Sequence, residues 1–497
     1  MDAQHSDAQP VHGEDTEAAT GGWNRRSFLK RAGAVGAVAA AGMAMSGTAT
    51  ATAAAKPTGT PVEPDPDILV IGAGFAGLAA ARHLRGMGFQ NVEILEARGR
   101  IGGRTWTDTL QGQQIELGAG WFHPSQSHIQ TALRKYGIGI VYDDPMDAVL
   151  AQQVDGTYRQ YDVGTAFETM GNLYTKFFQG TQTFLPNAMN PLQAKDLIAA
   201  QDVYTAANRY SQIGMTEAEK AWIGGTLAGY AGLPSTGASW TSLAHWWALG
   251  GYDANGWFNL TSQKPATGMI GLAQAMLNEA NHGISYNQNV VRISDPGTTG
   301  SQVSVTTAQN IVYRAKAVVC AVPTNVWNNI TFTYGIPQAF KDAATEGLGV
   351  PHAVKIWMYV RGPQTRTLVQ SKEGSKFESM VPMHKLPDGQ LMIAFGGAGL
   401  TLDKASLNAE VKKILGSAYE VVDFKLADWG HDPYARGGWS LRRPKQLLRH
   451  LPALQQPVGR IAFANDGLAS GWNGFIEGAI ESGINAAIKA AEASGMA

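Results

Sequence analysis

The chain has 497 residues, of which 44% are apolar and 16% are charged, and its formal net charge is −1. This composition indicates a globular protein with more than one lobe, and the balanced charge argues against nucleic acid or an anionic membrane surface as a partner. With Cys320 as the only cysteine, an intramolecular disulfide and a zinc site built from thiolates are excluded, and no metal-type histidine spacing is present, so we expect no metal.

The N-terminal segment has the features of an export signal. Residues 24–30 read Asn-Arg-Arg-Ser-Phe-Leu-Lys, and the apolar run Ala32–Met45 follows them. This run is shorter than the ~20 residues that a membrane span needs, and Ala53–Ala55 fits a cleavage site. We predict a twin-arginine signal peptide over residues 1–55, export to the periplasm, and no stable membrane anchor.

A complete βαβ pattern comes next. Asp67–Ile71 predicts a buried strand, and Gly72–Gly77 supplies a G-x-G-x-x-G turn before a helix that continues through Leu84. A second apolar strand, Val92–Leu95, ends at Glu96. Such a unit binds a dinucleotide, because the glycines admit a pyrophosphate at the helix N-terminus and the acid accepts hydrogen bonds from ribose hydroxyls.

The residues that follow separate FAD from NAD. The chain continues as Glu96-Ala97-Arg98-Gly99-Arg100-Ile101-Gly102-Gly103-Arg104 and later as Glu116-Leu117-Gly118-Ala119-Gly120-Trp121. Here it resembles the flavin amine oxidase family, which includes monoamine oxidases, polyamine oxidases and bacterial nicotine oxidases. The resemblance implies an α/β fold: a Rossmann-like FAD-binding domain of the GR2 type, with a second substrate domain of mixed sheet plus helices.

The resemblance also implies a domain division. The FAD-binding domain is expected to be discontinuous, over residues 56–125, 266–345 and 426–497. The substrate-binding domain then takes residues 126–265 and 346–425, where helical patterns such as Ile129–Tyr136 and Glu217–Leu227 replace the glycine fingerprints.

By the same resemblance, the FAD contacts map onto motifs along the whole chain. The expected cofactor-binding residues are Gly72, Gly74, Phe75, Ala76, Gly77, Glu96, Ala97, Arg98, Gly103, Arg104, Gly118, Ala119, Gly120, Trp121, Val290, Trp429, Asp466, Ile476 and Ala479. Asn465 departs from the family pattern, which has a glycine there. Asp466 is assigned the ribityl contact, although a longer spacing would give it to Gly467. The helix that begins near Gly474 is expected to point its N-terminus at the flavin.

The flavin is expected to be bound noncovalently. In the mammalian members a cysteine carries the flavin, and Gly438 stands at that position here. Cys320 lies in an apolar stretch that predicts a strand, so we interpret it as a small buried hydrophobic residue.

Three residues are expected to carry the chemistry. A protonated nitrogen cannot assist hydride loss, so the site must favour a neutral amine, and aromatic walls do this by desolvation. Trp439 and Phe475 fall at the two positions of the family's aromatic cage. Lys355 falls where the family places a lysine that acts through water on the flavin, whereas the alternative is an exposed strand lysine. Trp121, Tyr252 and Trp257 are further candidates for contact with substrate.

These observations predict oxidation of a small aromatic or heteroaromatic amine to an imine, closest in pattern to the bacterial nicotine and pseudooxynicotine oxidases. Trp121-Phe122-His123 replaces the arginine region of L-amino-acid oxidases, which argues against an amino-acid substrate. A phytoene-type desaturase would need membrane contact, and the sequence has no amphipathic membrane helix for it. An electron acceptor of either O2 or a cytochrome, a flavoprotein without this activity, and a homodimer all remain compatible with the sequence.

Overall fold

The computed structural model describes residues 65–298, 300–396 and 401–496, so the predicted signal peptide lies outside the described residues. Within them, five parallel strands form the first sheet, in the order β20-β13-β1-β2-β9. Their bounds are β20 (Ile461–Phe463), β13 (Ala317–Cys320), β1 (Ile68–Ile71), β2 (Val92–Leu95) and β9 (Gly283–Ser285).

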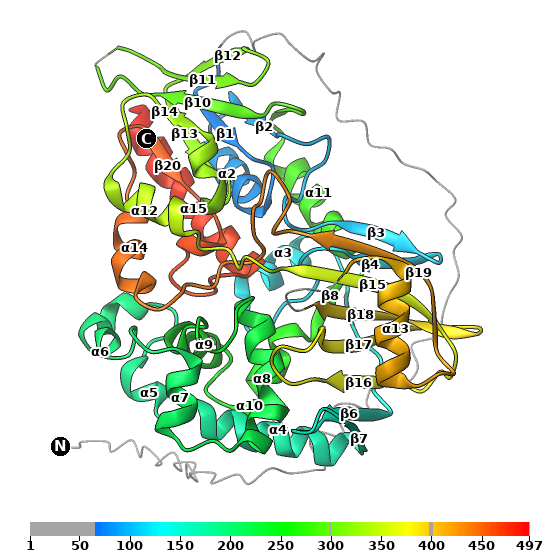
Figure 1. The fold of residues 1–497 in the computed structure, drawn as a ribbon. Coiled ribbons are helices and arrows are strands. Elements are labelled where there is room, and N and C mark those ends of the chain that lie inside the picture. Colours follow the sequence, from blue (N-terminus) through cyan, green and yellow to red (C-terminus); the bar gives the residue numbers. More distant parts are fainter. Residues whose placement is uncertain (1–64, 299, 397–400, 497) are drawn as a thin grey trace, which may run out of the picture. The chain divides into compact units, whose positions relative to one another are not determined.

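Both faces of this sheet are covered, as the unbroken apolar runs require. Ile68 and Val70 pack under four helices, whereas Leu69 and Ile71 pack toward a second sheet of order β12-β11-β10-β14. The helices are α2 (Phe75–Gly86), α3 (Ser127–Tyr136), α11 (Gly268–Ala280) and α15 (Ile476–Ser494). The second sheet consists of β10 (Val290–Ser294), β11 (Val303–Thr307), β12 (Val312–Ala315) and β14 (Thr331–Phe332), with α12 (Gln338–Glu346) beside it and α14 (Gln446–Leu454) nearby. The expected Rossmann-like architecture is therefore present, and α2 and α15 lie side by side (Figure 1).

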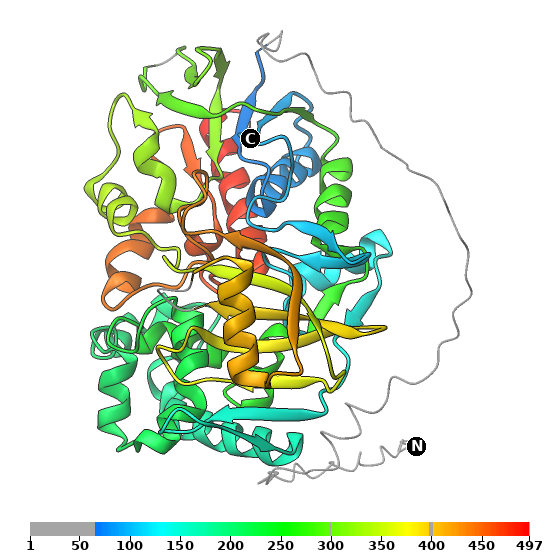
Figure 2. The same cartoon turned by 45° about the vertical axis from the view of Figure 1, so that its right-hand side comes forward.

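A seven-stranded mixed sheet of order β19-β15-β18-β17-β16-β6-β7 forms the second part of the described chain. Its strands are β6 (Ala148–Gln152), β7 (Tyr158–Tyr161), β15 (Val354–Arg361), β16 (Thr367–Gln370), β17 (Phe377–Leu386), β18 (Gly389–Gly396) and β19 (Glu420–Asp428). One face carries α13 (Lys404–Leu415), which crosses the strands in Figure 2.

The opposite face of this sheet packs against a helical layer. Trp357 and Ile393 from the sheet join one aromatic-rich core with residues of these helices. The layer comprises α4 (Val163–Phe178), α5 (Thr181–Phe184), α6 (Lys195–Ala199), α7 (Ala206–Gln212), α8 (Glu217–Ala231), α9 (Trp240–Leu249) and α10 (Ala254–Phe258). This is the expected mixed sheet with helices. No helix among the described residues is long and apolar enough to cross a bilayer.

Two short antiparallel pairs lie outside these sheets. β3 (Thr107–Leu110) pairs with β4 (Gln113–Glu116), and β5 (Ile140–Tyr142) pairs with β8 (Gln263–Pro265). The sequence-based division placed α3 in the substrate domain, yet its apolar face packs with α2, α11 and α15. Glu477 at the start of α15 accepts the backbone N–H groups of His128 and Ile129, which holds α3 against the FAD-type sheet. The division as a whole stays a prediction.

Candidate active site

The turn after β1 is shaped by glycines that a side chain would disrupt. Gly72 has φ of 100°, and a Cβ there would lie 2.8 Å from the Ala321 carbonyl oxygen. A Cβ on Gly77 would overlap the Gly72 carbonyl oxygen. At Gly74, by contrast, the nearest atom to a Cβ is the Gly103 Cα at 3.8 Å, so the backbone there stays open to a ligand.

The N-termini of α2 and α15 are both buried, and their N-cap residues, Gly74 and Phe475, make no capping hydrogen bond with a side chain. Phe75 and Ala76 open the first helix, and Ile476 and Glu477 open the second, each at most 7% exposed. Buried first-turn N–H groups need acceptors, and an anionic ligand supplies them. Gly483 lets the two helices approach, because a Cβ there would overlap the Ala76 carbonyl. The residues present therefore fit the pyrophosphate and ring of a flavin dinucleotide.

Glu96 is buried at the end of β2 and faces the same turn. Its carboxylate accepts the N–H groups of Ala73 and Arg98, both at 2.8 Å. Burial raises the pKa of Glu96, while these two hydrogen bonds oppose the rise. Val290 begins β10 close by, since the N–H of Gln288 donates to the Glu96 carbonyl. Both expected contacts for the adenosine part of the dinucleotide thus lie together.

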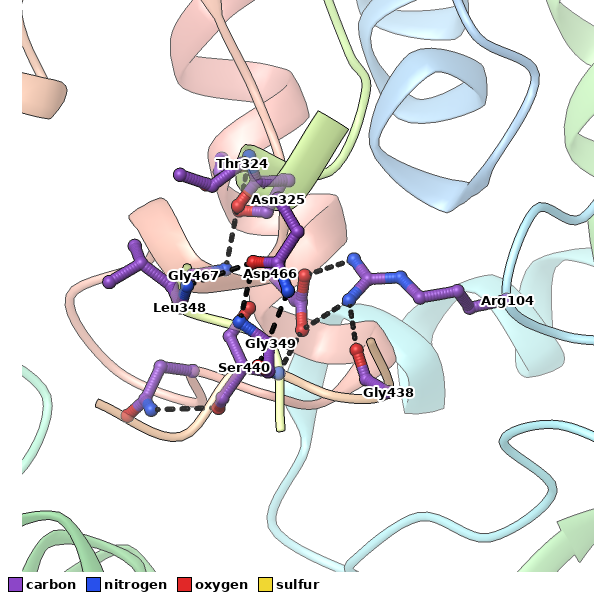
Figure 3. Close-up of polar contacts among 12 residues, drawn as sticks. Arg104, Thr324, Asn325, Leu348, Gly349, Gly438, Ser440, Asp466 and Gly467 are labelled. Carbon is purple, nitrogen blue, oxygen red and sulfur yellow. Dashed lines mark hydrogen bonds and ion pairs between the residues drawn. The ribbon is translucent and has the colours of Figure 1, made fainter. Parts of the chain in front are cut away.

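Figure 3 shows the contacts around Asp466. Its carboxylate forms an ion pair with Arg104 and accepts the Ser440 N–H at 2.8 Å. Arg104 also donates to the Gly438 carbonyl at 2.5 Å. The segments that contain Arg104, Ser440 and Asp466 are far apart in the sequence, and the Asp466 carboxylate joins them here.

Asn465, the departure from the family pattern, has a structural role. Its Oδ1 accepts the Gly467 N–H at 2.9 Å, and its Nδ2 donates to Thr324 Oγ1 at 3.2 Å. It thereby caps the short turn η4 (Asp466–Leu468) and ties it to the first residue of η3 (Thr324–Asn329), the turn that follows β13.

Side chains on and next to the seven-stranded sheet hold the segment from Glu116 to Trp121 by hydrogen bonds. Trp357 Nε1 donates to the Glu116 carbonyl at 2.9 Å, and Trp429 Nε1 donates to the Leu117 carbonyl at 3.2 Å. Lys355 Nζ donates to the Gly118 carbonyl at 3.0 Å. Two side chains of β15 and one from the residue after β19 thus bind three successive carbonyls, which places the predicted flavin-lining segment beside these two strands.

Lys355 is 6% exposed, so the alternative of an exposed strand lysine is wrong. Its Nζ lies 4.3 Å from the centre of the Trp121 ring. Burial lowers the pKa of Lys355 to about 7, against the opposing charges of Glu116 and Asp143. A lysine whose pKa is lowered in this way is suited to give or take a proton near neutral pH.

The two expected cage residues come from adjacent segments. Trp439 is half-buried and donates its indole N–H to the Tyr230 carbonyl at 2.8 Å. Phe475, also half-buried, packs edge-on against Trp246 with ring centres 4.9 Å apart. The two segments lie in close contact at Gly474, because a Cβ there would lie only 2.5 Å from the Ser440 carbonyl oxygen and glycine has none. Both rings extend one aromatic-rich core.

Comparison with known proteins identifies the family. The family described as flavin containing amine oxidoreductase matches residues 75–490. The chain belongs to this family. It is an FAD-dependent amine oxidoreductase, as the geometry of the dinucleotide turn and the buried lysine suggested.

The relatives of this amine oxidoreductase cover nearly its full length. A pseudooxynicotine dehydrogenase of a Pseudomonas species is 30% identical over 93% of this chain and 94% of its own. The (S)-6-hydroxynicotine oxidase of Paenarthrobacter nicotinovorans is 26% identical over 84% of this chain and 97% of its own. The solved structure of cyclohexylamine oxidase from Brevibacterium oxydans shares the fold, with a TM-score of 0.71 and 20% identity over 86% of this chain and 99% of that one.

Two of the further substrate candidates of this amine oxidoreductase, Tyr252 and Trp257, have other contacts. Trp257 is 2% exposed and packs against the rings of Tyr174, Phe178 and Tyr230. Tyr252 donates its hydroxyl to the Leu185 carbonyl at 2.6 Å. Packing and this hydrogen bond account for both positions, and their contact with substrate stays a prediction.

Cys320 is fully buried in β13, as expected. Burial raises the pKa of its thiol to about 12, which keeps it unreactive. At position 438 a Cβ would lie 2.4 Å from that of Ala353, so any side chain there would displace its neighbours.

Three charged residues near Lys355 were not assigned roles from the sequence. Glu116 was part of a quoted motif without a role of its own, whereas nothing in the local pattern marked Asp143 or Lys264. Glu116 accepts the Met269 N–H at 2.9 Å, while its Oε2 is buried and has no hydrogen-bond partner among the described residues. Burial raises the pKa of Glu116.

Proposed function

We propose that this enzyme oxidises a small heteroaromatic amine of the nicotine type to an imine, which then hydrolyses. Aromatic walls around the Trp439 and Phe475 positions support such a ring-bearing substrate. The full-length relatives whose names specify pseudooxynicotine and nicotine also support it. The observation that carries the proposal is the buried Lys355 beneath the Gly118–Trp121 segment.

The chain's own residues divide the work. FAD, when bound, supplies the two-electron acceptor for the carbon next to the amine nitrogen. A free alkylamine has a pKa of about 10, so an apolar wall such as Phe475 and Trp439 stabilises its neutral form by excluding water. Lys355 Nζ donates a hydrogen bond to the Gly118 carbonyl, and it gives or accepts a proton beside this segment. The Glu96 carboxylate and the helix N-termini of α2 and α15 hold the dinucleotide.

An anaerobic panel of amines read by bleaching of the flavin absorbance tests the substrate class. The panel contains pseudooxynicotine, nicotine, cyclohexylamine and putrescine. We expect rapid bleaching with the first two and slow bleaching with putrescine, whose second charge has no counterpart in an aromatic wall. Equal or faster bleaching with putrescine contradicts the proposal.

The electron acceptor is proposed to be O2, and a cytochrome is the second candidate because two relatives are named dehydrogenases. Stopped-flow mixing of the reduced enzyme with oxygen and then with cytochrome c separates them. The faster acceptor at matched concentration is the functional one.

We also propose noncovalent FAD and export through the twin-arginine pathway. Acid precipitation is expected to release free yellow FAD, and colour that stays on the pellet contradicts this. Replacing Arg25 and Arg26 by lysine is expected to retain the protein in the cytoplasm, whereas an unchanged periplasmic fraction argues against the signal.

A further inference from the structure

A partly buried ion pair lies beside the Trp121 ring. Asp143 directly follows β5, and Lys264 is the middle residue of β8, the strand that pairs with it. Their side chains form an ion pair and are 21% and 17% exposed. The second carboxylate oxygen of Asp143 accepts the Trp121 indole N–H at 2.7 Å.

Trp121 is therefore held from two directions. Asp143 binds its N–H in the ring plane, and the Lys355 Nζ lies 4.3 Å from the ring centre. A ring whose N–H donates to a carboxylate is richer in electrons and attracts a cation on its face more strongly. The ion pair thus acts on Lys355 through the ring as well as by charge.

We propose that Asp143 and Lys264 are positioning residues of the active site: they fix Trp121 against Lys355 and set how readily Lys355 holds its proton. The inference rests on the proposed proton-handling role of Lys355. Neither residue is expected to touch the substrate or the reacting atoms.

The charges around Lys355 predict opposite effects for the two members of the pair. Burial is the main cause of its lowered pKa, the charges of Glu116 and Asp143 raise that pKa, and the charge of Lys264 lowers it further. Burial lowers the pKa of His384 on β17, the charge of Lys264 lowers it further, and the charge of Asp143 raises it. Removing Asp143 should therefore make Lys355 lose its proton more easily, and removing Lys264 should make it hold its proton longer.

The test is a direct titration of Lys355 in the FAD-loaded enzyme without substrate. Protein labelled with ¹³C and ¹⁵N in lysine is followed by NMR across pH, and Lys355→Met identifies the signal. The midpoint is expected at about 7 in the wild type. We expect Asp143→Asn to lower it and Lys264→Met to raise it, each by about 0.5 pH unit or more.

Opposite shifts separate a specific electrostatic role from general damage, which would not move one midpoint in two directions. Asp143→Glu keeps the charge and should restore a midpoint closer to the wild-type value. In a second sample labelled with ¹⁵N in tryptophan, the indole N–H signal of Trp121 should move in Asp143→Asn and keep its wild-type position in Lys264→Met. Midpoints that shift in the same direction, or that do not shift, overturn the proposal.

The use of two variants keeps the test decisive even if one of them misfolds. If Asp143→Asn fails to bind FAD, the upward shift in Lys264→Met still decides, and its absence refutes the inference. Because no substrate is present, a failed amine panel leaves this result intact. Conversely, unchanged midpoints would leave the proposed amine oxidation standing.

Discussion

The buried Lys355 makes a quantitative prediction for the pH dependence of folding. Its pKa is about 7 in the folded protein, against 10.5 for an exposed lysine. Between these values the unfolded chain binds the proton and the folded one does not, so stability rises with pH through this window. At pH 7 and below, the folded protein instead bears the cost of the buried ammonium.

The magnitude follows from proton linkage. Near the middle of the window the difference in bound protons is close to one, which corresponds to about 1.3 kcal/mol of unfolding free energy per pH unit. From about pH 7.5 to about pH 9.5 the contribution of Lys355 is then about 2.5 kcal/mol. In Lys355→Met this contribution is lost, because methionine does not titrate.

The assay is guanidinium unfolding of wild type and Lys355→Met, read by tryptophan fluorescence at several pH values in this range. The wild-type curve should rise more steeply with pH, and subtracting the curves cancels the other titrating groups. Trp357→Phe is the matched control, because it removes a contact on the same strand without removing a titrating group. Curves for Lys355→Met and wild type that run parallel would refute the lowered pKa.

Four further outcomes follow from the contacts around the site. Gly438→Ala should destabilise the fold by about 1–3 kcal/mol because its Cβ overlaps that of Ala353. Adding Ala353→Gly to this variant should recover part of the lost stability, as measured by thermal unfolding. Asn465→Ala should lower stability by about 1 kcal/mol, since it removes the cap of η4, and an unchanged melting temperature would contradict that cap. Glu96→Gln should weaken FAD binding at least about tenfold in a fluorescence titration, because a charged acceptor is lost. Lys355→Met should slow reoxidation of the reduced enzyme at least about tenfold more than its reduction by amine, and equal slowing of both would remove the role assigned to Lys355.

Much of the fold was predictable because its signals are local. The strand, turn and helix at Asp67–Leu84 were expected, and the structure forms β1 and α2 there. Glycine spacing reports a backbone path directly, as the close contacts around Gly72 and Gly77 demonstrate. The helices expected at Ile129–Tyr136 and Glu217–Leu227 also form, because their apolar periodicity lies within one element.

Other features depend on residues that are distant in the chain. No local pattern predicts that Asp143 pairs with Lys264, since β5 and β8 are joined only by pairing of strands more than a hundred residues apart. The packing of α3 with the FAD-type sheet likewise depends on Glu477, near the other end of the chain.

The sequence by itself determined the cofactor-binding unit, the family and the residue types available for catalysis, because these follow from spacing and identity. Only the tertiary structure decided that Lys355 is buried, that Trp121 lies against it and that Asp466 meets Arg104. The reason is physical: the charge state of a side chain depends on how much water and which charges surround it. That environment is assembled by several segments at once and does not exist along the chain.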